Sequence, residues 1–388
     1  MNWRTPDSGG GAVEMKSFWR ADSSDGARVP VAKPRLPTFD QIAPYLRRID
    51  SARWYTNGGP LVQEFEERLA LHCGGGQARV ATVANATIGL TLALLASDLP
   101  MGTLCMVPSW TFAATGHAIL LAGLVPWIVD VSRETWALEA DEAREFLADA
   151  PGSVSAVIPV SPFGAPISLE SWRTFRDETG IAVIADSAAA FDNVRGSEIP
   201  AVVSLHATKI CGIGEGGFVV STGGAFIEEI QKRANFGFWN SRESTVRSFN
   251  GKLSEYAAAV GLAGLDTWPE TQADFLRVAH AYRQKLEDHE SLRLQPGFGE
   301  NWVASTVMVE SQTSNADMLT QVLAKKGIAS RRWWGGGLHQ HRSFQNFPRH
   351  RVRQTEALAD RIVGLPCWRD LPGESIEEVC ALLPSSRV

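Results

Sequence analysis

The sequence predicts an α/β fold, with a large domain built on a mostly parallel sheet and a smaller C-terminal α/β domain. Three observations lead to this prediction. The 388 residues, 44% of them hydrophobic, suffice for a large and a small domain, each with its own core. Short apolar runs alternate with helical patterns along much of the chain, which is typical of parallel sheets covered by helices. From about Ser254 the pattern changes to long helical stretches, and we place the domain boundary near residues 265–275.

The chain is expected to begin with a loose leader at residues 1–33. Residues 1–11 are polar and rich in glycine, without the apolar segment that a secretory signal contains. The first helix is predicted at residues 60–72. Pro60 suits its first turn, apolar residues recur at helical spacing, and Gly74 suits its end.

Strands and helices of the large domain are then expected in alternation. The apolar runs that indicate buried strands are 78–83, 104–107, 126–130, 156–160, 181–185 and 217–221. The helical patterns are 86–96, 111–123, 139–148 and 169–180. In such a sheet a ligand binds beyond the carboxyl ends of the strands.

A smaller domain is expected after these elements. Helix 254–268 leads into helix 272–290, and the smaller α/β region that follows contains strand 305–310 and helix 316–327. We therefore assign residues 34–268 to the large domain and residues 269–388 to the small one.

Composition excludes several classes of function. The net charge of −6 and the pI of about 5.8 argue against nucleic-acid binding, which usually needs a basic face. The five cysteines are scattered and never spaced C-x-x-C, so we expect neither a disulfide framework nor a metal site, and a reducing compartment fits. No apolar run is long enough to cross a membrane. We therefore expect a cytoplasmic protein.

Lys209 lies in a segment rich in small residues, SLHATKICGIGEGG at 204–217. A lysine is exposed by default, but this segment lies between two apolar runs. A partly buried lysine loses its proton more readily and can form a Schiff base with an aldehyde. Gly212, Gly214 and Gly217 also spell G-x-G-x-x-G. We reject a dinucleotide site, because that motif must open a helix and a strand is predicted after Gly217.

Three further segments carry candidate ligand-binding residues. Asp186 ends an apolar strand, where it is either a turn or capping residue or a carboxylate that faces a ligand. Ala86 and Thr87 begin a helix, either as an ordinary junction or as a phosphate seat with free N–H groups. Trp110 and Phe112 follow another strand, and either ring belongs to the core or stacks on a flat cofactor.

The order of these signals is more specific than any one of them. A phosphate seat, an aromatic residue, a strand-end aspartate and a lysine are what a pyridoxal-phosphate (PLP) site needs. The aspartate keeps the pyridine nitrogen protonated, and the lysine binds the aldehyde and moves protons.

The chain resembles the DegT/DnrJ/EryC1/StrS sugar aminotransferases over roughly residues 35–370. The segments that carry the resemblance are WYTNGGPLVQEFE, ANATIGL, PSWTFAAT, GLVPWIVDV with PFGAP, SLHATKICGIGEGG, NGKLSEYAAAVGLAGL and GIASRRWWGGGLHQH. The resemblance implies an aspartate-aminotransferase-like (type I PLP) fold. It also implies a homodimer with shared active sites, which cycles between PLP and its amine form.

The resemblance implies a role for each matched residue. Lys209 forms the Schiff base and moves protons, Asp186 pairs with the pyridine nitrogen, and Phe112 stacks on the ring. The phosphate is held by Ala86 and Thr87 N–H groups, the Ser204 hydroxyl and, from the other subunit, Asn250. Residues expected near the substrate are Trp54, Asn57, His206, Arg331, Trp334 and His339.

The chain also departs from the family pattern. Ala189 replaces a usual glutamine near the cofactor's 3′-oxygen, which removes a polar contact and leaves room for substrate. Ala86 stands where glycine is usual, and residues 331–337 read RRWWGGG instead of a tyrosine-rich segment. The lysine and the aspartate are both retained.

The leading hypothesis is therefore a transaminase that moves an amino group, with glutamate as the expected donor, to a keto group of a nucleotide-linked deoxysugar. Its product would enter surface-polysaccharide or glycosylated-metabolite synthesis. The alternatives are a PLP-dependent sugar dehydratase, in which histidine replaces the lysine, and a non-catalytic binding or regulatory protein. His339 and His341 have no acidic or cysteine neighbour in sequence, so they make a poor metal site.

Overall fold

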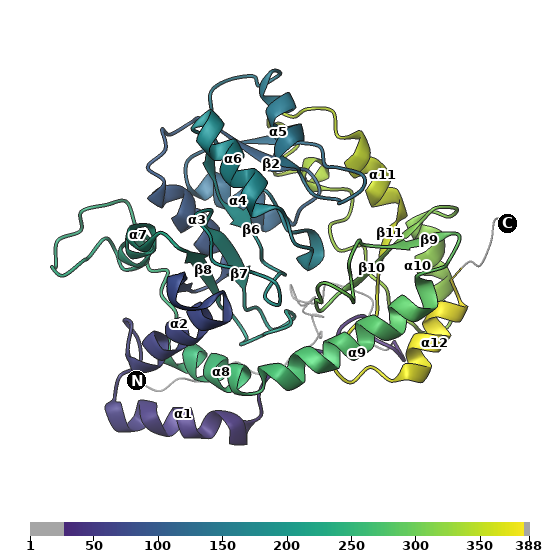
Figure 1. The fold of residues 1–388 in the computed structure, drawn as a ribbon, viewed down its shortest axis with the longest axis horizontal. Helices are drawn as coiled ribbons and strands as arrows, with labels where there is room; N and C mark the ends of the chain where they lie inside the picture. The colour runs from purple at the N-terminus through teal and green to yellow at the C-terminus, as the bar shows by residue number, and fades with distance from the viewer. Residues whose placement is uncertain (1–26, 384–388) are drawn as a thin grey trace, which may run out of the picture.

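The computed structural model describes residues 27–383 (Figure 1). Its helices are α1 (Phe39–Ala52), α2 (Pro60–His72), α3 (Ala86–Ala96), α4 (Ala113–Leu121), α5 (Ala140–Leu147), α6 (Leu169–Thr179), α7 (Gly224–Ala234), α8 (Glu255–Asp266), α9 (Trp268–Leu286), α10 (Ala316–Ala324), α11 (Arg353–Arg361) and α12 (Gly373–Ala381). Its strands are β1 (Arg79–Val83), β2 (Leu104–Pro108), β3 (Val125–Val129), β4 (Val154–Val157), β5 (Ala182–Val183), β6 (Ala185–Asp186), β7 (Ala201–Ser204), β8 (Gly217–Ser221), β9 (Leu292–Leu294), β10 (Val307–Ser311) and β11 (Ile362–Leu365).

The large sheet confirms the prediction of a mostly parallel α/β fold. Its strand orders, β1-β8-β7-β6 and β3-β2-β4-β5, join because β5 and β6 follow each other along one extended segment. Across the join, the Ile184 amide bonds the Val157 carbonyl at 3.1 Å, and the Ala185 amide bonds the Pro200 carbonyl at 2.8 Å on the opposite side. Strands β2 to β7 pair in parallel, whereas β8 is antiparallel to both its neighbours.

Successive side chains along these strands belong alternately to two separate hydrophobic cores, one on each face of the sheet. In β8, Phe218 and Val220 belong to one buried cluster and Val219 to the other. The first cluster contains side chains of α2, α5, α6 and α8, and the second contains side chains of α3, α4 and α7. Because strand side chains alternate between faces, helices cover both faces of this sheet.

The smaller sheet is antiparallel, in the order β11-β10-β9. Helices α8 and α9 run consecutively from the large sheet to the smaller one along one side of the molecule (Figure 1). Thr267 separates them, within the region where the sequence pattern changes. Helix α1 is not among the predicted elements, and it contains Pro44, a residue that disfavours helix interiors.

Residues 27–33 differ from the loose leader that we expected. The Val29 amide donates to the Gly327 carbonyl at 3.1 Å, and the Cys367 amide donates to the Val31 carbonyl at 3.0 Å. Both valines are buried, because an extended segment with apolar residues at alternate positions can add to the small domain. The rest of the expected leader, residues 1–26, lies outside the described residues.

The C-terminal region contributes to both sheets. Residues 338–352 return to the large sheet, where the Ile128 amide bonds the Pro348 carbonyl at 3.0 Å. Phe344 lies so close to Gly116 that a Cβ there would come within 2.6 Å of its ring. The proposed division at residues 268 and 269 therefore separates the two sheets but not all the segments that cover them. No helix among the described residues is long and apolar enough to cross a membrane.

Candidate active site

Lys209 lies in a tight loop between β7 and β8. The amide of Leu205 bonds the Gly216 carbonyl at 3.0 Å, and that of Ala207 bonds the Gly214 carbonyl at 2.8 Å. Gly214 has φ +98 and a Cβ on Gly212 would lie 2.7 Å from the Ala207 carbonyl oxygen, so the glycines allow this turn. Strand β8 begins at Gly217, which confirms that the glycine cluster opens a strand and not a helix.

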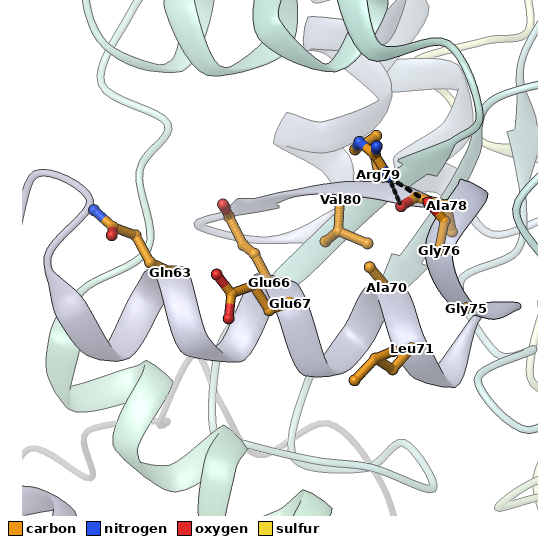
Figure 2. Close-up of a pocket in the computed structure, with 10 residues that line it drawn as sticks. All are labelled: Gln63, Glu66, Glu67, Ala70, Leu71, Gly75, Gly76, Ala78, Arg79 and Val80. Atoms are coloured by element: carbon orange, nitrogen blue, oxygen red, sulfur yellow. Dashed lines mark hydrogen bonds between the residues drawn. The ribbon is translucent and has the colours of Figure 1, made fainter.

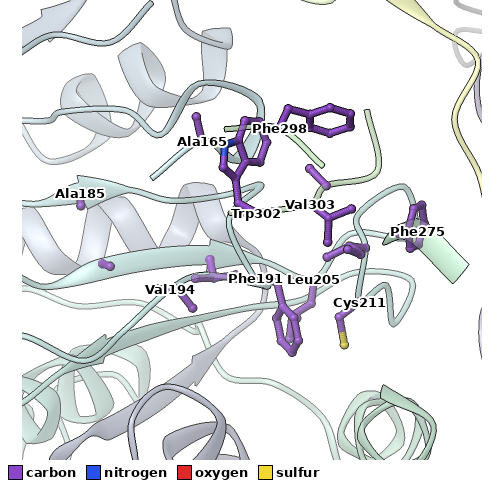
Figure 3. Close-up of a cluster of buried hydrophobic side chains, with 14 of the residues drawn as sticks. Ala165, Ala185, Phe191, Val194, Leu205, Cys211, Phe275, Phe298, Trp302 and Val303 are labelled. Atoms are coloured by element: carbon purple, nitrogen blue, oxygen red, sulfur yellow. The ribbon is translucent and has the colours of Figure 1, made fainter. Parts of the chain in front are cut away.

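Apolar side chains hold both ends of the Lys209 loop. Leu205 and Cys211 are buried and belong to the cluster that also contains Phe275 of α9 and Val303 (Figure 3). The loop is thus packed between the large sheet and the region that leads into the smaller one. This packing leaves Lys209 partly buried rather than on an open surface.

Asp186 ends β6 and is buried. Its Oδ2 accepts a hydrogen bond from the Thr115 hydroxyl at 2.7 Å, and its Oδ1 accepts one from the Ala188 amide at 3.1 Å. Thr115 belongs to the first turn of α4. The carboxylate at the end of β6 is therefore held in place by a hydrogen bond to each of its two oxygens.

The charges of Asp186 and Lys209 act on each other. Burial raises the pKa of Asp186, while hydrogen bonds from Thr115 and Ala188 and the charge of Lys209 oppose that shift. Burial also lowers the pKa of Lys209, and the charge of Asp186 opposes this shift. A lysine with a lowered pKa is the state that nucleophilic attack on an aldehyde needs.

The start of α3 lies beside Ser204 and Gly217. Asn85 caps this helix by accepting a hydrogen bond from the Ile88 amide at 3.0 Å. The amides of Ala86 and Thr87 come earlier in the helix and have no partner within it. Gly217 pairs with Ser204 across β7 and β8, and a Cβ on Gly217 would lie 2.8 Å from the Ala86 nitrogen. Through Gly217, Ser204 is therefore placed next to the start of α3, an arrangement that suits a phosphate group.

The two aromatic candidates have different environments. Trp110 is buried, with its ring centroid 5.3 Å from that of Trp334, which in turn stacks on Phe163 at 3.9 Å. Phe112 is 61% exposed and occupies the N-cap position of α4. Of the two, Phe112 is therefore the ring that is available to stack on a cofactor.

Three predicted residues lie on exposed surface. Trp54 is 49% exposed and donates its indole N–H to the Thr56 carbonyl at 2.7 Å. Asn57 has φ +65 in the turn before α2, a conformation that asparagine tolerates better than most residues. Asn250 is exposed and bridges Asn235 through the backbone.

His206, Arg331 and His339 have separate surroundings. The His206 ring bonds the Thr208 hydroxyl at 2.9 Å, within the Lys209 loop. Arg331 pairs through its backbone with Gly364 at the edge of the smaller sheet, and its guanidinium lies 4.4 Å from the centre of the Trp333 ring. His339 is buried, and its Nδ1 lies 2.6 Å from the Ser109 hydroxyl oxygen. His339 therefore contacts the segment 108–115 through Ser109.

Ala189 follows Asp186 in the turn after β6. A Cβ on Gly164 would lie 2.7 Å from the Ala189 carbonyl oxygen, so the backbone of this turn packs against the segment 162–164. The methyl side chain of Ala189 supplies no hydrogen-bonding group where a glutamine amide was expected.

A surface pocket lies between α2 and the edge strand β1, away from the residues described above (Figure 2). Its lining includes Glu66, Glu67 and Arg79 but none of the predicted site residues. Among residues 27–383, no group of three or more histidine, cysteine, aspartate or glutamate side chains is arranged to hold a metal ion.

Sequence reasoning missed the residues that support the site. Thr111 and Thr115 were noted only as part of a matched segment, yet both are buried and Thr115 contacts Asp186. The available signal was the i, i+4 spacing of two hydroxyl residues across a helix start. Ser109 and His339 are 230 residues apart, and no local pattern connects them.

The arrangement fits PLP in its donor chemistry. A buried carboxylate suits a protonated pyridine nitrogen, a partly buried lysine suits an aldehyde, and a helix start with a hydroxyl suits a phosphate. The groups that were predicted separately, at Ala86, Asp186, Ser204 and Lys209, lie around the ends of neighbouring strands of one sheet.

Comparisons with known proteins agree with this assignment. A family model described as the DegT/DnrJ/EryC1/StrS aminotransferase family matches residues 39–384. A dTDP-4-amino-4,6-dideoxy-D-glucose transaminase from Escherichia coli is 27% identical over 370 residues, which cover 92% of this chain and 98% of the relative.

Two solved structures resemble the chain along most of its length. A putative PLP-dependent aminotransferase from Bacillus cereus has a TM-score of 0.86 and 29% sequence identity, covering 92% of this chain and 99% of the other. DesI, crystallised in the presence of its TDP-sugar product, has a TM-score of 0.82 and 32% identity, covering 92% of each chain.

Proposed function

The chain belongs to the DegT/DnrJ/EryC1/StrS aminotransferase family and uses PLP as its cofactor, and on this basis we propose that it aminates a nucleotide-linked deoxysugar. The amino group comes from an amino acid, with glutamate as the expected donor. The acceptor is a keto group of the sugar. The product then enters surface-polysaccharide or glycosylated-metabolite synthesis.

The observation that carries the proposal is the placement of Lys209 and Asp186 on adjacent strands, since Asp186 ends β6 and Lys209 lies in the loop that follows β7. The charges of the two side chains act on each other at the ends of neighbouring strands. A retained lysine favours amino transfer over sugar dehydration, for which the expected residue is histidine. The E. coli relative is named for a dTDP-linked amino sugar, and DesI was crystallised with a TDP-sugar, which supports a nucleotide sugar as the substrate of this chain.

Each residue contributes a defined task to this reaction. Bound PLP supplies an electron sink for the carbon that gains or loses the amino group. Lys209 holds the cofactor between turnovers and carries protons to and from the substrate carbon. Asp186 keeps the ring nitrogen protonated. Phe112 covers one face of the ring, and the Ala86 and Thr87 amides and Ser204 hydroxyl hold the phosphate.

We further propose a homodimer whose subunits complete each other's sites through Asn250, which reaches the phosphate of the partner subunit. Its exposed position on a single subunit agrees with this role. We place the enzyme in the cytoplasm, because the cysteines among the described residues are all free and four are buried, as in proteins of reducing compartments.

The first experiment is the near-visible absorbance spectrum of the purified protein with PLP, measured before and after adding glutamate. We expect wild type to show a band that depends on Lys209 and is bleached by glutamate. Lys209→Ala is expected to lack this band, since it removes the amine that binds the aldehyde. His206→Ala, which changes a ring in the same loop, is the control and is expected to retain the band.

The outcomes separate the competing functions. A band that glutamate leaves unchanged would mean that the donor is another amino acid or that the protein is a non-catalytic relative. Absence of the band in wild type would overturn the proposed function itself.

A further inference from the structure

Asp186 is connected to two buried hydroxyl groups that the proposed function does not use. The Thr115 hydroxyl lies 2.7 Å from Asp186 Oδ2, and the Thr111 hydroxyl oxygen lies 2.8 Å from that of Thr115. Thr111 and Thr115 are 1% and 0% exposed, so water does not compete for these contacts. The three side chains form a continuous row from the segment after β2, through the first turn of α4, to the end of β6.

The direction of these hydrogen bonds follows from the charge of Asp186. An ionised carboxylate only accepts hydrogen bonds, and a threonine hydroxyl has one proton to donate. The Thr115 hydroxyl therefore donates a hydrogen bond to Asp186 and accepts one from the Thr111 hydroxyl. The row is directed, with every hydroxyl proton pointing toward the carboxylate.

We propose that Thr115 is a positioning residue for Asp186, and that Thr111 orients the Thr115 hydroxyl, so that the pair keeps the carboxylate ionised and aimed at the cofactor's ring nitrogen. The inference rests on the proposed function, because Asp186 needs a cofactor to act on. It adds two residues that do not touch the cofactor but act through one that does.

Burial and hydrogen bonding have opposite effects on the charge of Asp186. Burial favours the neutral acid and raises the pKa of Asp186, whereas the Thr115 hydroxyl, the Ala188 amide and the charge of Lys209 favour the carboxylate. The Ala188 amide belongs to the backbone, and only proline would remove it, with a change in backbone conformation. Thr115 is thus the neighbouring side chain that can be changed without altering either charge.

The test is Thr115→Val, which keeps the shape of the side chain and removes its hydroxyl. The readout is the pH midpoint of the change in absorbance of the bound cofactor, measured on the PLP-loaded protein. We expect the midpoint to rise by about one pH unit, corresponding to about a tenfold change in a protonation equilibrium. Without the Thr115 hydroxyl, Asp186 takes up a proton more readily and no longer keeps the ring nitrogen positively charged. Because that positive charge disfavours a second one nearby, its loss lets the Lys209 nitrogen keep its proton to a higher pH.

Three further variants make the test specific. Thr115→Ser restores the hydroxyl and is expected to return the midpoint to the wild-type value. Thr111→Val leaves Thr115 in place and is expected to give a smaller rise. Thr355→Val removes an equivalent buried contact, from the Thr355 hydroxyl to Asp130 at 2.9 Å, and is expected to lower stability without moving the midpoint.

An unchanged midpoint in Thr115→Val that still binds PLP would overturn this inference. The proposed function would then stand, since it depends on the Lys209 band of the wild type. If Thr115→Val does not fold, a midpoint in Thr111→Val that matches wild type would overturn the inference instead.

Discussion

Asp186, which is buried, and Glu66, which is partly buried, show at the residue scale how neighbours act on a carboxylate. Asp186 receives hydrogen bonds and the charge of Lys209, all of which favour its ionised form. Glu66 accepts hydrogen bonds from the Thr82 amide at 2.7 Å and the Thr82 hydroxyl at 2.8 Å, but no cation contributes to its pKa shift. Burial therefore dominates and raises the pKa of Glu66 from 4.5 to about 7.

This shift predicts a pH-dependent stability. Between about pH 4.5 and 7 the folded protein retains a proton on Glu66 that the unfolded chain has released, so stability falls as the pH rises through this range. The loss is at most about 3 kcal/mol. We expect Glu66→Gln to remove this part of the fall, measured by urea unfolding at pH 5 and pH 8.

The control for this prediction is Glu67→Gln, on the exposed face of the same helix. It is expected to keep the wild-type dependence on pH. Equal pH dependence in Glu66→Gln and wild type would show that Glu66 ionises normally in the folded protein.

Two junctions shape the site at the scale of elements. The first is the close contact between the start of α3 and the start of β8, where Gly217 has no room for a side chain. The second is the Lys209 loop, which returns directly into β8. Both junctions meet where β7 and β8 pair Ser204 with Gly217, so one strand pair positions the phosphate groups and the lysine together.

Gly217→Ala tests the first junction. Its Cβ would lie 2.8 Å from the Ala86 nitrogen and 2.9 Å from the Val203 carbonyl oxygen, so the helix start must move. We expect PLP affinity to fall about tenfold, which corresponds to about 1.4 kcal/mol, in a direct binding titration. Gly224→Ala, where a Cβ meets nothing within 4 Å, should bind PLP as wild type does. Unchanged affinity in both variants would remove the helix start from the phosphate site.

At the scale of the whole molecule, large apolar side chains remain exposed on the single chain. Those in the segments that the proposal places at the site or beside Asn250 are Trp54, Tyr55, Phe112, Phe236, Trp239 and Tyr256. Exposed aromatic groups of this kind often mark a protein interface. A second copy of the chain would cover apolar surface and complete the phosphate site at once.

Hybrid dimers of Lys209→Ala and Asn250→Ala test this arrangement. If Asn250 serves the partner's site, one site of each hybrid carries both changes and the other carries neither. By symmetry, a hybrid should then recover about half of the wild-type activity, although each parent dimer is impaired. Activity of the purified hybrid in the amino-transfer assay is the measurement. No recovery in a hybrid of confirmed composition would place Asn250 in the site of its own subunit, and an unimpaired Asn250→Ala parent dimer would place it outside any site.

Local sequence determined the order and type of most elements of the large domain. Pro60 in a first turn and the helical pattern from Ala86 are local signals, and both helices begin at the predicted residues, with Asn85 as the cap of the second. The strand-end position of Asp186 and the loop position of Lys209 are also predicted locally. Apolar runs that alternate with helical patterns indicate parallel strands, and the carboxyl ends of such strands lie at the same edge of the sheet.

Which side chains face one another depends on how the elements pack in three dimensions. The tertiary structure placed Trp110 in a core and left Phe112 exposed, although the two are neighbours in the same segment. It brought residues 338–352 back to the large sheet and Thr115 to Asp186, 71 residues along the chain. The physical reason is that helix caps, turns and alternation depend on neighbours in sequence, whereas burial and hydrogen bonding of a side chain depend on whichever elements pack against it.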